Sequence, residues 1–106
     1  MDLLKKSIEL LEKVNGKDIA VYEFLEKSPY YDYFVVATVN ERAGQAAIGY
    51  FGKELKENLR AIEGNKGNTG WTLIDLGDVV VHLFTEKDRE FYGFDKRFME
   101  LRKEIK

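Results

Sequence analysis

Trp71, Asp75, Asp78 and His82 are the residues of this chain whose types and spacing could do chemistry or make a specific contact. Trp71 and His82 are the only tryptophan and the only histidine in the sequence. A pair of nearby aspartates could hold Mg²⁺ or act in acid catalysis. A tryptophan beside charged groups is also typical of the anchor residues of protein interfaces. The segment 70–84 is therefore where a functional site is expected.

Two runs rich in β-forming residues flank Leu76-Gly77, and this pattern predicts a hairpin whose two-residue loop is Leu76-Gly77. Glycine in the loop supplies the positive φ that such turns require. The register predicted from this loop pairs Asp75 with Asp78, Leu73 with Val80, and Trp71 with His82. Directly opposed like charges destabilise a strand pair, so a role other than folding is one explanation for the aspartates.

Side chains alternate between the two faces of a hairpin, which predicts one mixed face and one apolar face. The mixed face is expected to carry Trp71, Leu73, Asp75, Asp78, Val80, His82 and Phe84. The other face, the natural core side, is expected to carry Thr72, Ile74, Val79, Val81 and Leu83. Two interpretations of the mixed face stay open: a functional surface, or solvated turn aspartates with Trp71 and His82 covered by a helix.

Length and composition predict one soluble globular domain over residues 1–106. The sequence has no cysteine, so we expect no disulfide framework and no thiolate metal cluster. The lack of cysteine also favours a reducing, cytoplasmic location. The N-terminus resembles neither a signal peptide nor a membrane span, so we expect a soluble protein. Lysine and arginine total 17 against 19 acidic residues, a formal charge of -2. That balance disfavours direct binding of RNA or DNA and suits a basic protein partner.

The chain offers little else for catalysis. One histidine and scattered acids give no recognisable metal-ligand spacing. Ser7 and Ser28 lie in contexts typical of a helix face and a turn, without a nucleophile-elbow pattern. The glycine-rich segment 64–70 lacks the ending of a phosphate-binding loop and leads into a strand, so we interpret it as a mobile hairpin connection. We therefore expect no enzyme activity, no cofactor and no metal.

One basic cluster favours RNA, but its pattern has a simpler interpretation. It comprises Lys53, Lys56, Arg60 and Lys66, with Glu54, Glu57 and Glu63 between them. Interleaved charges of both signs are typical of a solvated helix face. We therefore expect little direct contact with nucleic acid.

Hydrophobic periodicity predicts the elements that must position the hairpin. We expect a helix from Asp2 to Asn15 that stops at Asn15-Gly16, a strand over 18–24, and a strand over 33–39 at the middle of the sheet. A second helix is predicted over 41–62, and a short strand over 61–63 is an option. Three glycines lie inside that helix: Gly44, Gly49 and Gly52. They indicate either close approach to a neighbouring backbone or a frayed, kinked helix.

After the hairpin, the pattern predicts short helices. Thr85 opens a weak capping box for a helix that Gly93 closes, and Asp95 is expected to cap a last helix. The apolar face of that last helix is expected to carry Phe98, Leu101 and Ile105. The order of elements predicts an α/β (α+β mixed) fold: a small mixed β-sheet with helical cover.

Several short motifs follow one another in a characteristic order along nearly the whole chain. They are Lys17-Asp18-Ile19, the run 32–38, Gln45 and Ala46, Glu63-Gly64, Gly70-Trp71, the run 75–82 and the run 89–92. In this order the chain resembles the ribosomal silencing factor family, also called Iojap or RsfS. The resemblance implies a nucleotidyltransferase-like fold without its active site. It also implies a factor that binds the large ribosomal subunit through its fourteenth protein, blocks association with the small subunit and represses translation under nutrient limitation. Residual nucleotide binding is the alternative.

By position, the resemblance implies partner contacts at Trp71, Asp75, Leu76 and Asp78, with His82 and Tyr33 as further candidates. Basic side chains on the partner would account for the acidic hairpin. The chain departs from the family pattern at 39–44 and at 94–98, and both departures leave the hairpin intact. A homodimer of the isolated protein, formed through exposed aromatics among Tyr30, Tyr31 and Phe94, is a further hypothesis.

Overall fold

The computed structural model describes residues 2–64 and 70–103. Within them the elements are α1 (Asp2–Lys13), β1 (Lys17–Glu23), β2 (Tyr33–Thr38), α2 (Glu41–Glu54), β3 (Ala61–Glu63), β4 (Trp71–Asp75), β5 (Val79–Phe84), α3 (Glu86–Tyr92), α4 (Phe94–Arg97), the 3₁₀ turn η1 (Met99–Leu101) and β6 (Arg102–Lys103). The strands form one mixed sheet in the order β3-β4-β5-β2-β1-β6. The predicted mixed α/β fold with a small sheet is confirmed.

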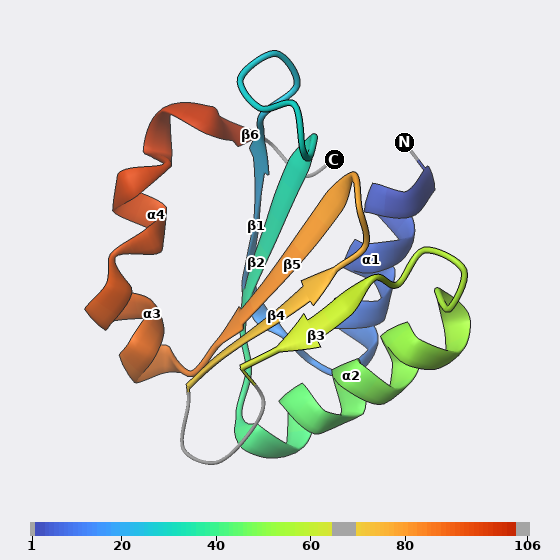
Figure 1. Ribbon diagram of the computed structural model, residues 1–106. Helices are drawn as coiled ribbons and strands as arrows, with labels where there is room; N and C mark the ends of the chain where they lie inside the picture. Colours follow the sequence, from blue (N-terminus) through green and yellow to red (C-terminus); the bar gives the residue numbers. More distant parts are fainter. Residues whose placement is uncertain (1, 65–69, 104–106) are drawn as a thin grey trace.

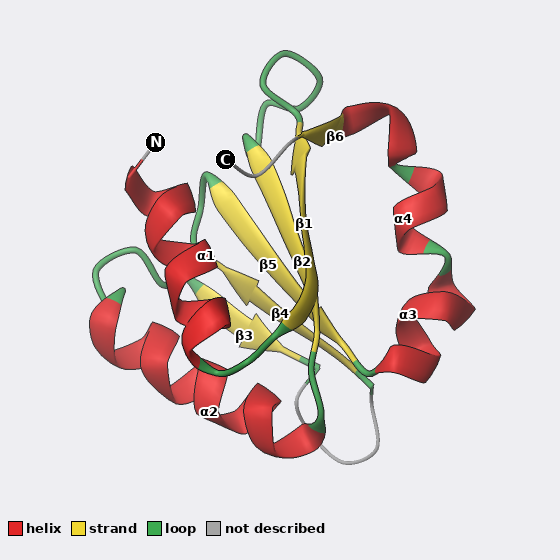
Figure 2. Cartoon of the chain, turned by 180° about the vertical axis from the view of Figure 1, so that it is seen from behind, coloured by secondary structure: helices red, strands yellow, loops and turns green. Residues whose placement is uncertain are grey.

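Helices cover both faces of the sheet (Figures 1 and 2). Under α1 and α2 the core is mainly aliphatic, and its fully buried side chains include Leu11, Val35, Ile74 and Val81. Under α3 and α4 the core is mainly aromatic, and it is built around Tyr22, Phe24, Phe34, Phe84 and Phe94. No helix in the described part of the chain is long and apolar enough to cross a membrane.

β2 lies in the interior of the sheet, as its apolar run predicts. It pairs in parallel with β5 on one side and antiparallel with β1 on the other. The side chains from Phe34 to Ala37 are buried. Because β2 and β5 run parallel, the residues that precede the two strands meet at one end of the sheet. That end contains the β4–β5 turn.

The first helix ends at the predicted Asn15-Gly16 stop. Asn15 adopts the left-handed conformation with φ 61°. The Gly16 N–H donates to the Leu11 carbonyl at 2.8 Å, and the Asn15 N–H donates to the Glu12 carbonyl at 3.0 Å. These two bonds are the Schellman pattern, which satisfies carbonyls that a helix end otherwise leaves without partners. Asparagine tolerates this conformation better than most residues.

The second helix is shorter than predicted, because α2 ends at Glu54 and not at Ile62. The next residues form a turn, and the optional strand over 61–63 is confirmed as β3. Leu59 and Ile62 still pack against the core under α1 and α2, so their apolar spacing is satisfied without a helix. The Arg60 N–H donates to the carbonyl of Asp75 at 2.8 Å, which shows that pairing with β4 replaces helical hydrogen bonds.

The glycines of α2 do not mark a close backbone contact. A Cβ built on Gly49 or Gly52 would meet nothing within 4 Å, and one on Gly44 would meet only the Val39 side chain at 3.5 Å. The explanation by close approach to a neighbouring backbone is therefore wrong. We find no packing reason for these glycines in the described structure.

The C-terminal part keeps one predicted cap and replaces another. Thr85 caps α3 by accepting from the Asp88 N–H at 3.3 Å, and Gly93 ends α3 with φ 59°. Asp95 is not a helix cap, because α4 begins after Gly93 and has no side-chain cap. The chain then adds β6, which pairs with β1 at the sheet edge and was not predicted. Ile105, and the predicted connection over 64–70 except for Gly64 and Gly70, lie outside the described residues.

Asp95 instead joins α4 to α3 and to the sheet. Its carboxylate accepts from the Arg89 guanidinium at 2.7 and 2.9 Å and from the Tyr22 hydroxyl. Arg89 also donates to the Thr38 hydroxyl at 2.9 Å. The hydrogen bond from Arg89 lowers the pKa of Asp95, and burial together with Asp95 raises the pKa of Tyr22 to about 12. This network holds α3 and α4 against the aromatic face of the sheet.

Candidate docking surface at the β4–β5 hairpin

The hairpin forms, but its loop is Gly77-Asp78 and not Leu76-Gly77. β4 and β5 pair Trp71 with Phe84, Leu73 with His82, and Asp75 with Val80. The Leu76 N–H donates to the Val79 carbonyl at 2.9 Å and closes the turn. Gly77 has φ 87° and occupies the first central position, which fits a type II′ turn. The predicted register, with Asp75 opposite Asp78, is therefore wrong.

The error in register leaves the two faces of the strands as predicted. The pairing moves by two residues, and side chains alternate with a period of two, so no strand residue changes face. Ile74, Val79, Val81 and Leu83 pack under α1 and α2. Trp71, Leu73, Val80 and Phe84 pack in the aromatic core under α3 and α4. The two aspartates are no longer opposed, so the destabilisation expected from the sequence does not arise.

The two aspartates of the hairpin have different roles in the fold. Asp75 is half-buried, and its carboxylate accepts from the Gly77 N–H at 2.8 Å, which stabilises the turn. The Asp78 side chain is exposed. The backbone carbonyl of Asp78 accepts from the N–H groups of Asp32 and Tyr33, at 2.7 and 3.0 Å. Asp78 therefore ties the start of β2 to the turn while its carboxylate faces solvent.

Asp32, which was not among the site residues predicted from the sequence, adds a third carboxylate to this end of the sheet. Tyr33 pairs with Val79 in the parallel ladder, so Asp32 and Asp78 precede neighbouring strands. An aspartate just before each of two strands is the sequence signal that could have shown it, once parallel pairing was assumed. We call Asp32, Asp75 and Asp78 the acidic turn.

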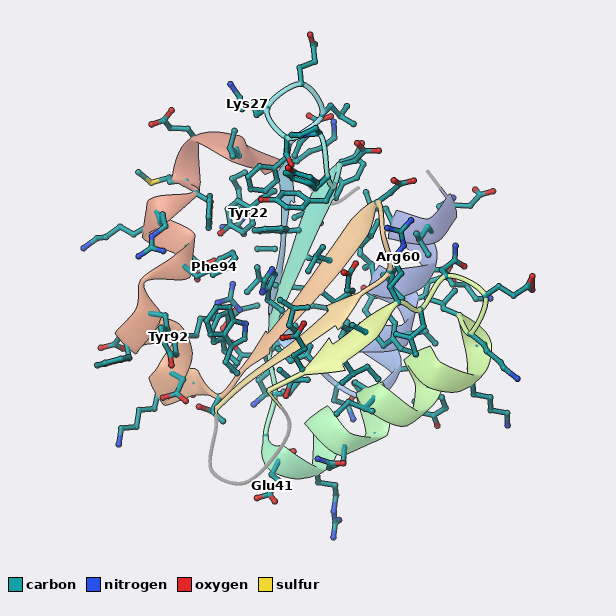
Figure 3. The ribbon with its side chains drawn as sticks, viewed as in Figure 1. Tyr22, Lys27, Glu41, Arg60, Tyr92 and Phe94 are labelled. Carbon is teal, nitrogen blue, oxygen red and sulfur yellow. The ribbon has the colours of Figure 1, made fainter. Side chains whose placement is uncertain are left out.

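Arg60 is the cation placed beside the acidic turn. A Cβ built on Gly77 would lie 3.1 Å from the Arg60 Nε, so the guanidinium covers the turn glycine. Figure 3 labels Arg60 at this end of the sheet. None of the three aspartates has an ion-pair partner within residues 2–64 and 70–103. In the same residues, no group of three or more His, Cys, Asp or Glu is placed to hold a metal ion.

Trp71 and His82 lie at the other end of the hairpin from the acidic turn. Trp71 and Asp75 are separated along β4 by about 13 Å, from a rise of about 3.3 Å per residue. Trp71 is half-buried, stacks on Phe84 at 5.2 Å and contacts the Tyr92 ring of α3 at 5.1 Å. The structure therefore separates Trp71 from the aspartates with which it was grouped.

His82 is inside the protein, with 3% of its surface exposed. Its Nδ1 accepts from the Trp71 indole N–H at 3.1 Å. The rings of Phe34 and Phe94 lie 4.5 and 4.7 Å from the imidazole. Burial lowers the pKa of His82 to about 3, so the ring is neutral at physiological pH.

The hydrogen bond from Trp71 fixes which nitrogen of His82 carries the proton. Because Nδ1 accepts, the neutral imidazole carries its hydrogen on Nε2. That Nε2 is buried and has no hydrogen-bond partner among the described residues. A buried donor without an acceptor costs about 1–3 kcal/mol. His82 therefore lowers the free energy of unfolding relative to an apolar residue, and folding alone does not explain why a histidine is present.

The remaining candidates lie at the turn end of the hairpin. Leu76 is 3% exposed and packs under α1 and α2, and Tyr33 is half-buried on the same face.

Of the aromatic residues predicted for self-association, Tyr30 is 80% exposed but Phe94 is only 7% exposed, so the prediction of Phe94 as an exposed contact is wrong. Phe91 of α3 is a further exposed aromatic side chain, at 78%, that was not among those predicted for self-association.

These features define a small mixed α/β protein with one sheet, a covered aromatic face and an acidic turn. Residues 1–105 match the model of a family described as ribosomal silencing factor during starvation, RsfS. The chain belongs to this family, which confirms the resemblance found from the sequence.

Relatives with names and structures agree with this assignment. The chain is 32% identical over 97 residues to the ribosomal silencing factor RsfS of Chromobacterium violaceum, covering 89% of this chain and 80% of that protein. It is 28% identical over 96 residues to the mouse protein named mitochondrial assembly of ribosomal large subunit protein 1, covering 84% of this chain and 42% of that protein. A crystal structure of a Chromobacterium violaceum protein superposes with a TM-score of 0.82 at 30% identity, covering 92% of this chain and 83% of that one.

Proposed function

We propose that this protein silences translation without catalysing a reaction. It binds the large ribosomal subunit through the subunit's fourteenth protein, blocks association with the small subunit and so represses translation under nutrient limitation. Family membership supports silencing. The name of the mouse relative supports a partner in the large subunit. The extents of 34 × 32 × 24 Å would let the protein act as a steric block at the face where the subunits meet.

The acidic turn is the observation that carries the proposal. Its three aspartates come from two segments of the chain, the residue before β2 and the β4–β5 turn, and they lie at one end of the sheet, where Arg60 covers Gly77. Like charges that gather without ion-pair partners are unfavourable for the isolated fold. They become favourable when a basic surface docks, because charge complementarity steers encounter and fixes orientation.

The candidate residues take different parts in this interface. Asp78 is the direct charged contact, because its carboxylate is exposed and has no role in the turn. Asp75 shapes the turn as well as contributing charge. Leu76 and Tyr33 support the turn from the core side. Trp71 is an aromatic anchor at the far end of the hairpin, and His82 lies behind it.

Co-sedimentation with purified large subunits tests the proposal. Asp78→Lys should weaken binding about tenfold, in the range of a moderate hot spot, while the melting temperature stays unchanged. Glu9→Lys makes the same charge change at an exposed position on α1 and is the matched control. Asp75→Lys should lower both binding and stability, because it removes the hydrogen bond to Gly77.

Two results would overturn this function. One is that the wild-type protein fails to migrate with large subunits. The other is that large and small subunits still associate fully in its presence. Equal weakening by Asp78→Lys and Glu9→Lys would leave silencing standing but would remove the acidic turn as the contact.

Nucleotide binding is a second candidate with one observation in its favour. An open cavity of about 780 Å³ lies at the ends of β2 and β5 opposite the acidic turn, next to Glu41, which Figure 3 labels. Four basic side chains from four elements line it, Lys13, Lys17, Arg42 and Lys87, together with the acidic side chains of Glu41 and Glu86. Calorimetry with ATP and Mg²⁺ tests this candidate. Absence of heat with the wild-type protein, or equal heat with Arg42→Glu, would rule it out.

A homodimer of the isolated protein is also compatible with silencing by the monomer. The strongly exposed aromatics Tyr30 and Phe91 are the side chains to test for self-association. Light scattering over a range of concentrations measures it. A mass that stays at 12.3 kDa at all concentrations would exclude the dimer.

A further inference from the structure

We propose that His82 is a positioning residue: it fixes the orientation of the Trp71 indole, and so presents Trp71 to the partner as a preformed anchor. This inference rests on the proposed docking function. The sequence predicts His82 as a contact with the partner, and here His82 instead orients the residue that makes the contact. The partner would touch the half-buried Trp71 and would not reach the imidazole, which is 3% exposed.

Packing alone does not explain a histidine at this position. Its neighbours include the rings of Phe34, Phe94 and Trp71, at 4.5, 4.7 and 5.8 Å between ring centroids. A leucine or phenylalanine would fill such an apolar site without bringing a polar atom into it. Histidine brings two nitrogens, and its Nε2 remains buried without a partner in the described structure. The fold therefore carries a penalty that an apolar residue would avoid.

The nitrogen that does have a partner shows what the histidine supplies. Nδ1 accepts from the Trp71 Nε1–H at 3.1 Å, across the strand pair in which His82 faces Leu73. Stacking on Phe84 leaves the indole free to flip about its χ2 torsion, because ring contacts set distance and tilt and a flip exchanges the edges of the ring while keeping its plane. A directional hydrogen bond removes that freedom. His82 thus determines which edge of the indole faces the core.

A fixed indole is useful at an interface. Trp71, Phe84 of the sheet and Tyr92 of α3 form a cluster of three rings whose centroids lie 5.1 to 5.8 Å apart, and Tyr92 is 43% exposed. The outer edge of Trp71 is therefore presented next to an aromatic side chain that solvent, and a partner, can reach. Anchors that are already ordered before binding avoid the entropy loss of being ordered by the partner. His82 would act in binding only through Trp71.

The indole N–H gives a direct test, because Trp71 is the only tryptophan and yields one indole signal in a ¹⁵N-labelled sample. In His82→Leu the signal should lose its hydrogen-bonded shift and its hydrogen should exchange at least about tenfold faster, as expected for loss of a protecting bond. His82→Asn places an amide oxygen near the position of Nδ1 and should restore both properties. Unchanged shift and exchange in His82→Leu would overturn the proposal.

A double-mutant cycle tests whether His82 acts through Trp71. Binding to large subunits should fall several-fold in His82→Leu and recover in His82→Asn, while His82→Leu in a Trp71→Phe background should have no further effect. Equal loss in both backgrounds, or wild-type binding by Trp71→Phe, would overturn the positioning role. If the wild-type protein binds no large subunits, the proposed function fails, and the indole signal still decides whether His82 orients Trp71.

Discussion

Lowering the pH from 7 to 5 should destabilise this protein through His82. Burial among aromatic rings lowers the pKa of His82 to about 3, from an ordinary value of 6.5 in the unfolded chain. Below pH 6.5 the unfolded chain therefore binds a proton that the folded protein does not. The stability that comes from keeping His82 neutral is complete above pH 6.5, and it is lost progressively as the pH falls from 6.5 toward 3.

The magnitude follows from the interval between pH 6.5 and pH 5. Each pH unit in this interval costs about 1.4 kcal/mol, so 1.5 units give a loss of about 2 kcal/mol. The result holds for any folded-state pKa well below 5, so it does not depend on the depth of the shift. For a domain of this size the melting temperature should fall by about 8 °C. Histidine is the only side chain whose ordinary pKa lies in this interval, and the chain has one.

Urea unfolding at pH 7, 6 and 5, followed by far-ultraviolet circular dichroism, measures the effect. The matched control is His82→Leu, whose unfolding free energy should be nearly constant over the same interval. Circular dichroism is preferred to fluorescence, because the variant alters the surroundings of Trp71. Equal losses in the wild-type protein and in His82→Leu would refute the reasoning, as would a wild-type loss below about 0.5 kcal/mol.

The same unfolding assay at pH 7 checks three further substitutions. Asp95→Asn should destabilise by about 1–2 kcal/mol, because it leaves Arg89, whose side chain is 12% exposed, without its carboxylate; an unchanged midpoint would show that the network is not stabilising. Gly49→Ala should stabilise by about 0.5–1 kcal/mol, since the added methyl meets nothing within 4 Å, and a loss would reveal a constraint on α2. Gly77→Ala should cost about 1–2 kcal/mol, because φ is 87° and Arg60 lies 3.1 Å from the new Cβ; wild-type stability would contradict the turn geometry.

The hairpin shows which part of the fold the sequence determines by itself. Alternation assigned every strand residue to the correct face, because the period of two survives a two-residue shift of register. The loop was misplaced by one residue, because glycine can take the first or the second central position of a tight turn. The choice is made by the Leu76–Val79 hydrogen bond and by Arg60, which packs on Gly77 from a distant segment.

The end of α2 and the C-terminal strand β6 show a second limit of predicting secondary structure from the local sequence pattern. Apolar residues at 55, 59 and 62 satisfy helical spacing, yet a turn and β3 bring the same side chains to the same core. After the turn that follows α2, the Arg60 N–H donates to the Asp75 carbonyl of β4 and not to a carbonyl of a longer helix. β6 is similar, since its two residues become a strand only because the edge of β1 is available. Neither partner strand is visible in the local pattern.

The sequence assigns the hairpin side chains to their faces, but it does not give the depth at which each side chain is buried. Periodicity places Trp71 and His82 on one face, and it gives no information on what covers that face. Cover is provided by α3 and α4, which Arg89 and Asp95 join to Tyr22, 73 positions before Asp95. A contact so distant in sequence decides that His82 is buried and that Trp71 is half-buried. Burial depth, and with it the difference between a residue that touches a partner and one that orients it, is therefore a property of tertiary packing.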